Sequence, residues 1–184
     1  MKINKNLPNQ LTLFRMLLVP VYAVLFLVDF KNHLIISGIV FIVASLTDFF
    51  DGRIARKYNL VSDFGKFADP VADKILVLTS VVLFCEAGRV SGWSAAIMVA
   101  REIMVASLRY MAVLKNRVLA ADIFGKIKTM LQMVALVLMH FEGILSFLTI
   151  PATVLYYLAV LFTIISGANY LIKNRDVISY GFED

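Results

Sequence analysis

Six apolar stretches alternate along the chain with short turns that carry charged residues, glycine or proline. Each stretch is close to the roughly 20 residues that an α-helix needs to cross the hydrocarbon core of a bilayer. The pattern predicts an all-α, polytopic integral membrane protein with six transmembrane helices at residues 8–30, 34–57, 64–88, 93–115, 121–141 and 147–173. Because no internal repeat or low-complexity stretch divides this order, we expect one domain over residues 1–184.

The start of the chain superficially resembles a signal peptide, since Lys2 and Lys5 precede the first apolar stretch. Arg15 interrupts that stretch, however, and no small-residue cleavage site follows it. We therefore expect a retained first helix. The residues at its start, Asn6 to Asn9, predict an N-terminal segment that lies along the membrane interface.

Composition supports the membrane prediction. Of the 184 residues, 60% are hydrophobic, whereas a soluble domain averages roughly 45–50%. This length accommodates the predicted helices and leaves little chain for a soluble domain. The single Cys85 excludes an internal disulfide.

The net charge of +5 is spread along the chain in a way that indicates topology, and we expect no nucleic-acid partner. Both termini and alternate junctions hold Lys2, Lys5, Arg53, Arg56, Lys57, Lys66, Lys115, Arg117, Lys126, Lys128, Lys173 and Arg175, whereas the opposite junctions hold Lys31 and Arg89. By the positive-inside rule, both termini lie in the cytoplasm. His33 and His140 then fall in outer loops, where we expect them to be surface residues.

Four aspartates stand at fixed spacings in the second and third predicted helices: Asp48, Asp51, Asp69 and Asp73. A carboxylate is costly inside a membrane, so one that is present usually faces an interior site. Four close together repel one another unless they are compensated, and hard oxygen ligands suit Mg²⁺ or Mn²⁺. Spacings of three and four residues put each pair on one helical face. Two antiparallel helices would then form a cage for one or two divalent ions, open to the cytoplasm.

The residues between the two aspartate pairs favour a phosphate ligand. Gly52 and Gly65 carry no side chain that would block the close approach of a ligand, and Ala55 keeps the same face shallow. Arg56 adds a guanidinium, whose planar fork suits phosphate. Two metals can stabilise both the attacking and the leaving oxygen of an in-line displacement, so the pattern predicts a diphosphate site.

The whole pattern, D-x2-D-G-x2-A-R-x8-G-x3-D-x3-D from Asp48 to Asp73, resembles without departure the signature of the CDP-alcohol phosphatidyltransferases. The segments Leu7–Arg15, Ala100–Glu102 and Gly125–Thr129 are most similar to the bacterial phosphatidylglycerophosphate synthase branch of that family, although Ala68 stands where that branch would have leucine. The resemblance covers most of the chain. It implies an enzyme that transfers the phosphatidyl group of CDP-diacylglycerol to an alcohol and releases CMP.

The resemblance also implies roles for individual residues and a setting for the enzyme. Asp48, Asp51 and Asp69 would bind the metal ions, and Asp73 would complete the cage and act as general base for the acceptor hydroxyl. The CDP moiety would contact Gly52, Arg56 and Ser62, with Asn9 and Thr12 nearby. The resemblance further implies six transmembrane helices, a homodimer, and an active site on the cytoplasmic face of a bacterial cytoplasmic membrane.

The acceptor alcohol is predicted from cations in the later helices. Arg101 and Arg109 are eight residues apart and lie broadly on one side of a helix, separated by about 80°, and Lys126 opens the next predicted helix. Three cations suit the phosphate of glycerol 3-phosphate, whose free primary hydroxyl would be the nucleophile. Alternatively, Arg101 pairs with a carboxylate, such as Glu102, of a neighbouring helix or subunit, and the two lysines snorkel. For Lys128 we favour snorkelling.

Other functions remain open at this point. Inositol phosphate is also an anionic acceptor, and only the resemblance of the N-terminal and Gly125–Thr129 segments favours glycerol 3-phosphate. Prenyl-diphosphate enzymes also use aspartate-rich helices, but at other spacings. A small cation transporter would carry its charges near the bilayer midplane, whereas these charges gather toward one face beside arginine and lysine.

Overall fold

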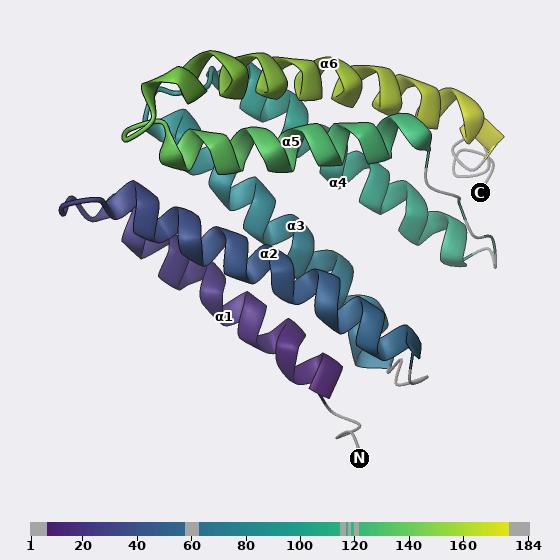
Figure 1. The fold of residues 1–184 in the computed structure, drawn as a ribbon. Coiled ribbons are helices and arrows are strands. Elements are labelled where there is room, and N and C mark those ends of the chain that lie inside the picture. Colours follow the sequence, from purple (N-terminus) through teal and green to yellow (C-terminus); the bar gives the residue numbers. More distant parts are fainter. Residues whose placement is uncertain (1–6, 58–62, 115–116, 118, 120–121, 177–184) are drawn as a thin grey trace. The chain divides into compact units, whose positions relative to one another are not determined.

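A computed structural model describes residues 7–57, 63–114, 117, 119 and 122–176, with the side-chain surroundings left out for 7–8, 48–57, 63–70 and 114. Within these residues the chain is all-α (Figure 1). The helices are α1 Leu7–Leu27, α2 His33–Lys57, α3 Asp63–Glu86, α4 Gly92–Leu114, α5 Ile123–Phe141, the short η1 Ser146–Leu148 and α6 Thr149–Lys173.

The apolar stretches predicted these helices closely, which confirms the all-α prediction. In the described part of the chain, three helices are long and apolar enough to cross a membrane, at Asn9–Leu27, Ile123–Phe141 and Ser146–Lys173. A full set of six membrane spans and the interfacial N-terminal segment stay predictions.

The chain divides into two compact units, which are described separately. Unit 1 comprises Met1–Ala87 and His140–Ser146, and unit 2 comprises Gly88–Met139 and Phe147–Asp184. The single domain expected over residues 1–184 stays a prediction.

In unit 1, α1 packs against both α2 and α3, and α2 also contacts α3 (Figure 1). The turn between α1 and α2 contains Asn32 with a φ of 65°, a left-handed conformation that asparagine tolerates better than most residues. Its carbonyl accepts hydrogen bonds from the amides of Ile35 and Ile36 in the first turn of α2. Because this turn is tight, the start of α1 lies beside the end of α2.

His140 is the centre of the aromatic core of unit 1. Its ring stacks on Phe41 with the centroids 5.5 Å apart and meets Phe84 edge-on at 4.8 Å. Its Nε2 lies 3.1 Å from the hydroxyl of Tyr22, which donates a hydrogen bond of 2.9 Å to Ser80 Oγ. Side chains of α1, α2 and α3 thus surround the His140 ring. We call Tyr22, Phe41, Ser80, Phe84 and His140 the aromatic anchor.

The anchor corrects one prediction. His140 was expected at the surface of an outer loop, but it is fully buried at 0% exposure. A residue near the end of an apolar stretch looks accessible in the sequence, whereas here the helices of unit 1 cover it. The ring nitrogen is satisfied by the Tyr22 hydroxyl, as a buried polar group requires.

We expect Gly38→Ala to destabilise unit 1 strongly. A Cβ at this position would lie 2.6 Å from His140 Cβ, which is too close for carbon atoms, so the anchor must shift. Such overpacking costs about 1–3 kcal/mol. Thermal unfolding of the detergent-purified protein, followed by the reaction of the single Cys85 with a thiol-reactive dye, will show a midpoint several degrees below that of the parent.

Gly143→Ala is the matched control for this substitution. It makes the same chemical change in unit 1, but a Cβ there meets no atom within 4 Å. Its midpoint should stay near that of the parent. Equal midpoints for both variants would contradict the close packing of His140 on α2.

In unit 2, α4 packs against α6 (Figure 1). At one end the hydroxyls of Ser94 and Tyr156 lie 3.1 Å apart in a buried hydrogen bond. Further along, α5 approaches α6 where the rings of Phe124 and Phe162 stack with centroids 6.3 Å apart. These contacts fix the three helices around a buried interior in which polar residues are well represented.

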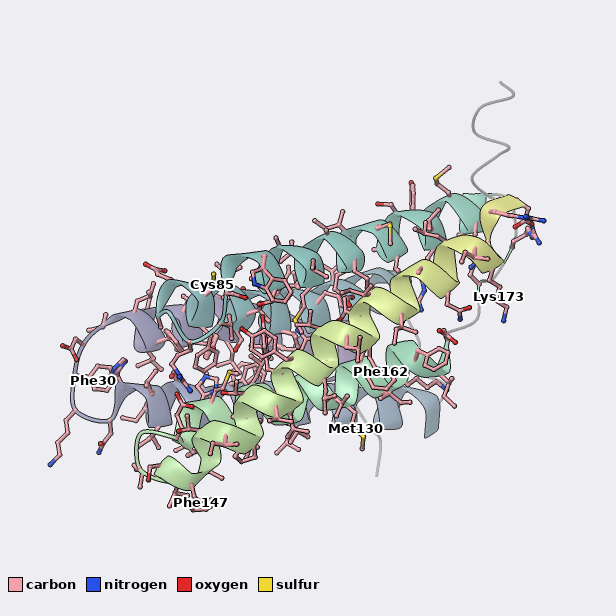
Figure 2. The ribbon with its side chains drawn as sticks, turned by 90° about the horizontal axis from the view of Figure 1, so that it is seen from above. Phe30, Cys85, Met130, Phe147, Phe162 and Lys173 are labelled. Atoms are coloured by element: carbon pink, nitrogen blue, oxygen red, sulfur yellow. The ribbon has the colours of Figure 1, made fainter. Side chains whose placement is uncertain are left out.

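Large apolar side chains also point outward from the helices. Met130 is 72% exposed and Phe147 is 70% exposed, and Figure 2 shows both projecting away from the ribbon. Exposed apolar residues continue along α6, where Ile150 and Ile172 are the most exposed. Such a surface is unfavourable in water and is typical of helices that face lipid.

Candidate functional site

The four motif aspartates lie on two neighbouring helices of unit 1. Asp48 and Asp51 belong to α2, and Asp69 and Asp73 belong to α3. Because both segments are helical, spacings of three and four residues put each pair on one face of its helix. The side chains of Asp48, Asp51 and Asp69 lie outside the described residues.

The same limit applies to several predicted CDP contacts. Gly52 and Arg56 fall within α2, but their surroundings are outside the described part, and Ser62 lies outside the described residues altogether. Their roles stay predictions.

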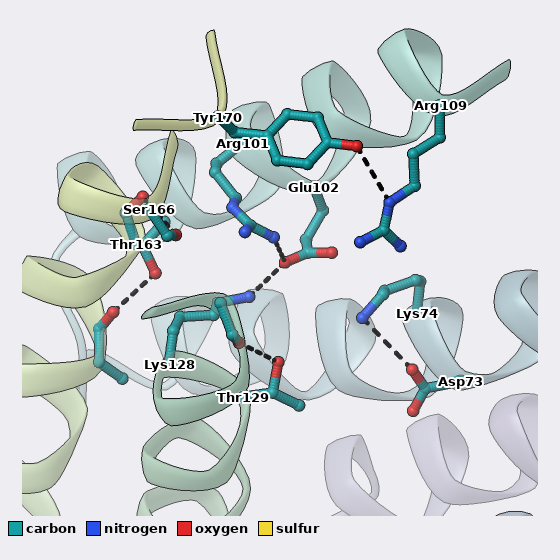
Figure 3. Close-up of polar contacts among 12 residues, drawn as sticks. Asp73, Lys74, Arg101, Glu102, Arg109, Lys128, Thr129, Thr163, Ser166 and Tyr170 are labelled. Carbon is teal, nitrogen blue, oxygen red and sulfur yellow. Dashed lines mark hydrogen bonds and ion pairs between the residues drawn. The ribbon is translucent and has the colours of Figure 1, made fainter. Parts of the chain in front are cut away.

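Asp73 is the motif aspartate whose side chain is described. Its Oδ2 lies 3.3 Å from Nζ of Lys74, with 34% of the aspartate side chain exposed (Figure 3). An ion pair this exposed contributes little energy. The Asp73 carboxylate is therefore accessible to a ligand or to a substrate proton.

The first helix reaches the same end of unit 1. Arg15 is fully buried, and its Nε donates to Thr47 Oγ1 at 3.4 Å. Thr47 directly precedes Asp48 in α2, so this contact positions α1 beside the motif. Thr12 is one helical turn before Arg15 and is also fully buried, and Asn9 is partly buried at the start of α1.

Arg15 was not predicted as a site residue. The signal for it was present, because a charge within an apolar stretch is expensive unless it is paired in the interior. In the sequence, Arg15 argued against a cleaved signal peptide and ended one of the segments that carry the family resemblance, but neither observation indicated a role in the site.

A second polar cluster lies in unit 2 and joins α4 to α5. Glu102 is 6% exposed, and its Oε1 accepts a hydrogen bond of 3.0 Å from Arg101 Nη1. The same oxygen accepts a hydrogen bond from Nζ of Lys128, which is 2% exposed (Figure 3). Pairing of Arg101 with Glu102 was the alternative left open by the sequence, and it occurs within one chain.

Lys128 corrects the snorkelling prediction, because a snorkelling lysine keeps its ammonium in water. Lys126 is instead the exposed member of the pair. Two residues are separated by about 200° around a helix, so Lys126 and Lys128 point to opposite sides of α5. The sequence could not tell which side faces α4.

Arg109 is fixed by Tyr170 of α6. Its Nε donates to the tyrosine hydroxyl at 3.3 Å, and its guanidinium carbon lies 5.8 Å from the ring centroid. Tyr170 in turn packs against Val105 and Leu108 of α4. In unit 2, α4 thus carries two arginines whose guanidinium groups contact Glu102 and Tyr170. Their predicted role in binding an anionic ligand stays a prediction.

The predicted metal site draws its donors from α2 and α3. Among residues whose side chains are described, no group of three or more histidines, cysteines, aspartates or glutamates is placed to hold a metal ion. Three of the four motif aspartates are outside that set. The donors themselves are carboxylate oxygens on adjacent helices, and this chemistry fits a hard divalent cation.

Comparison with known proteins identifies relatives along most of the chain. A family model described as CDP-alcohol phosphatidyltransferase matches residues 5–165. A protein of Rickettsia prowazekii is 38% identical over 92% of this chain and 96% of its own length. Proteins of Bacillus subtilis and Salmonella paratyphi A are 35% and 40% identical, over 94% and 92% of this chain and 97% and 95% of their own. All three are named CDP-diacylglycerol–glycerol-3-phosphate 3-phosphatidyltransferase.

Proposed function

Because this chain belongs to the CDP-alcohol phosphatidyltransferase family, we infer that it is a membrane enzyme that makes phosphatidylglycerophosphate. It transfers the phosphatidyl group of CDP-diacylglycerol to glycerol 3-phosphate and releases CMP. The observation that carries this conclusion is the identity of 35–40% to enzymes of that name over more than nine-tenths of the chain.

The reaction needs a base for the acceptor. The primary hydroxyl of glycerol 3-phosphate attacks the phosphatidyl phosphorus, the bond from that phosphorus to the CMP oxygen breaks, and the hydroxyl proton must leave. Asp73 would accept this proton, because its carboxylate is accessible and stands in the motif. Burial of the reacting groups away from water would favour transfer to the alcohol over hydrolysis.

A divalent metal is the cofactor that this family uses. Asp48, Asp51, Asp69 and Asp73 would hold it, and we propose two ions of Mg²⁺ or Mn²⁺. When bound, the metal would neutralise the diphosphate and the charge that develops on CMP. Support comes from the donor chemistry and from the helical spacing of each pair.

The CDP moiety would bind at the same end of unit 1. Its proposed contacts are Asn9, Thr12, Gly52, Arg56 and Ser62. The hydrogen bond from Arg15 to Thr47 supports this proposal for Asn9 and Thr12, because it brings the first turns of α1 beside the motif segment of α2.

The acceptor phosphate would bind to Arg101 and Arg109 of α4, with Lys126 as the third cation proposed from the sequence. Support comes from the ordered arginines, which are held by Glu102 and Tyr170. Lys126 has weaker support, since it is exposed whereas Lys128 contacts Glu102.

The membrane arrangement follows from the charges in the turns. We propose six spans, an interfacial N-terminal segment and cytoplasmic termini, with the active site on the cytoplasmic face of a bacterial cytoplasmic membrane. A homodimer is proposed from the resemblance to the family alone.

An acceptor panel tests the function. Detergent-purified protein is incubated with CDP-diacylglycerol and Mg²⁺, and glycerol 3-phosphate, inositol 1-phosphate, serine and inositol are offered in parallel. We expect CMP and a lipid product only with glycerol 3-phosphate. Turnover with another acceptor would keep the family and change the substrate, and a folded sample that releases no CMP with any acceptor would contradict the enzyme assignment.

A further inference from the structure

The Arg101 side chain is held at several atoms by its neighbours in unit 2. Nη1 donates to Glu102 Oε1 at 3.0 Å. A Cβ on Gly125 of α5 would lie 3.1 Å from Nη2, and one on Gly167 of α6 would lie 3.3 Å from Cγ. The two helix backbones therefore pass close to the arginine, and a larger residue at either glycine would press against its side chain.

The third guanidinium nitrogen of Arg101 is Nε. This nitrogen is buried and has no hydrogen-bond partner among the described residues, and the whole Arg101 side chain is 12% exposed. A buried polar donor without a partner is unfavourable. Nε and the neighbouring Nη2 form a fork that matches two oxygens of a phosphate. The geometry of Arg101 thus suits an oxyanion on this edge.

We propose that Glu102 is a positioning residue for the acceptor phosphate, which it serves by holding Arg101 through Nη1 so that the Nε edge stays available. This inference rests on the proposed function, because it takes the phosphate of glycerol 3-phosphate as the oxyanion. Glu102 itself, being negative, does not touch the phosphate. Its second contact, from Lys128 of α5, fixes the carboxylate between two helices.

Glu102→Gln distinguishes a positioning role from simple charge neutralisation, because the two roles predict opposite changes in the KM for glycerol 3-phosphate. The amide keeps an oxygen at the same place but loses the charge-assisted hydrogen bond that fixes Arg101. If Glu102 positions Arg101, the KM for glycerol 3-phosphate rises about tenfold, and the KM for CDP-diacylglycerol stays the same. If Glu102 only offsets positive charge, the pocket becomes more attractive to an anion and this KM falls.

Gly125→Ala is the second variant, and it decides the case if Glu102→Gln does not fold. It removes no polar group, yet its Cβ displaces Nη2 by a few tenths of an ångström. We expect the KM for glycerol 3-phosphate to rise about threefold, since small misplacements at a reacting site are costly. Gly92→Ala in α4 is the matched control, because a Cβ there meets no atom within 4 Å, and its KM should equal that of the parent.

An Arg101→Ala background completes the experiment. If Glu102 acts through Arg101, adding Glu102→Gln to this background leaves the KM for glycerol 3-phosphate unchanged. A fall in the KM for glycerol 3-phosphate would overturn the proposal. An unchanged KM in both Glu102→Gln and Gly125→Ala, with a drop in thermal stability, would also overturn it and leave Glu102 a structural role.

Failure of the wider function would look different. A parent enzyme that makes no product from glycerol 3-phosphate would contradict the function itself. An Arg101→Ala enzyme with an unchanged KM would contradict the acceptor pocket and, with it, the role of Glu102. If the KM for glycerol 3-phosphate rises in Arg101→Ala but not in Glu102→Gln, only the positioning role of Glu102 is refuted.

Discussion

Asp73→Asn enzyme will bind CDP-diacylglycerol as the parent does but turn it over about 10²–10⁴ times more slowly. The amide keeps the size of the carboxylate and can still offer an oxygen to a metal ion, but it cannot accept the hydroxyl proton. The described carboxylate is accessible and paired only weakly with Lys74, so the substitution should disturb the fold little. CMP release under saturating substrates gives kcat, and binding to lipid-loaded micelles gives the affinity.

Asp29→Asn provides the control for this experiment. It makes the same change at an exposed position in the turn between α1 and α2, and its kcat should match that of the parent. Parental turnover in Asp73→Asn would refute the role of Asp73 as base. Lost substrate binding at intact thermal stability would instead indicate that Asp73 serves mainly in the metal cage.

Removal of divalent cations will abolish CMP release. Four carboxylates cannot remain ionised close together without a counter-charge, and the diphosphate of the substrate adds further negative charge. Protein stripped with excess EDTA and dialysed should have no measurable activity, and titration with Mg²⁺ or Mn²⁺ should restore it. Full activity in excess chelator would contradict the metal-assisted mechanism.

The aspartates can be compared directly in the same titration. Asp48→Asn should raise the Mg²⁺ concentration needed for half-maximal activity by about tenfold or more, because one charged ligand is worth at least that in affinity. Asp63→Asn is the matched control, since Asp63 lies between the two pairs but outside the motif spacing. An equal shift in both variants would indicate a general loss of negative charge rather than specific ligation.

The helices could be predicted from the sequence because long apolar stretches between short polar turns leave a strong and simple signal. The stretch at 147–173 corresponds to α6 at Thr149–Lys173, and the stretch at 34–57 corresponds to α2 at His33–Lys57. Length and apolar composition determine such segments locally, so no knowledge of the neighbouring helices is needed.

Side-chain environment could not be predicted in the same way. Lys126 and Lys128 are chemically identical and two residues apart, and only the position of α4 decides which of them is buried against Glu102. His140 was misplaced for a similar reason, because rings from three other helices cover it. Long-range packing of this kind leaves no trace in the local periodicity.

The candidate site contains both residues that the sequence predicted and contacts that it did not. The motif spacing identified Asp73 and its three partner aspartates without any structure. Arg15 was missed as a site residue, because its role is defined by its contact with Thr47. The sequence did offer Glu102 as a possible partner of Arg101, but it gave no sign of the second contact of Glu102, with Lys128 of α5.

The aromatic anchor has a geometric consequence for α1. Tyr22 is held at the anchor, whereas Asn9 is thirteen residues earlier at the other end of the helix, which is about 20 Å away at 1.5 Å per residue. A rigid-body tilt of about 3° around Tyr22 would move Asn9 by roughly 1 Å, and a displacement of that size at a reacting site can cost about 10²-fold in rate. If Asn9 contacts CDP as proposed, small angular errors at the remote anchor are magnified at the substrate, and the buried His140 influences turnover without contacting a reacting atom.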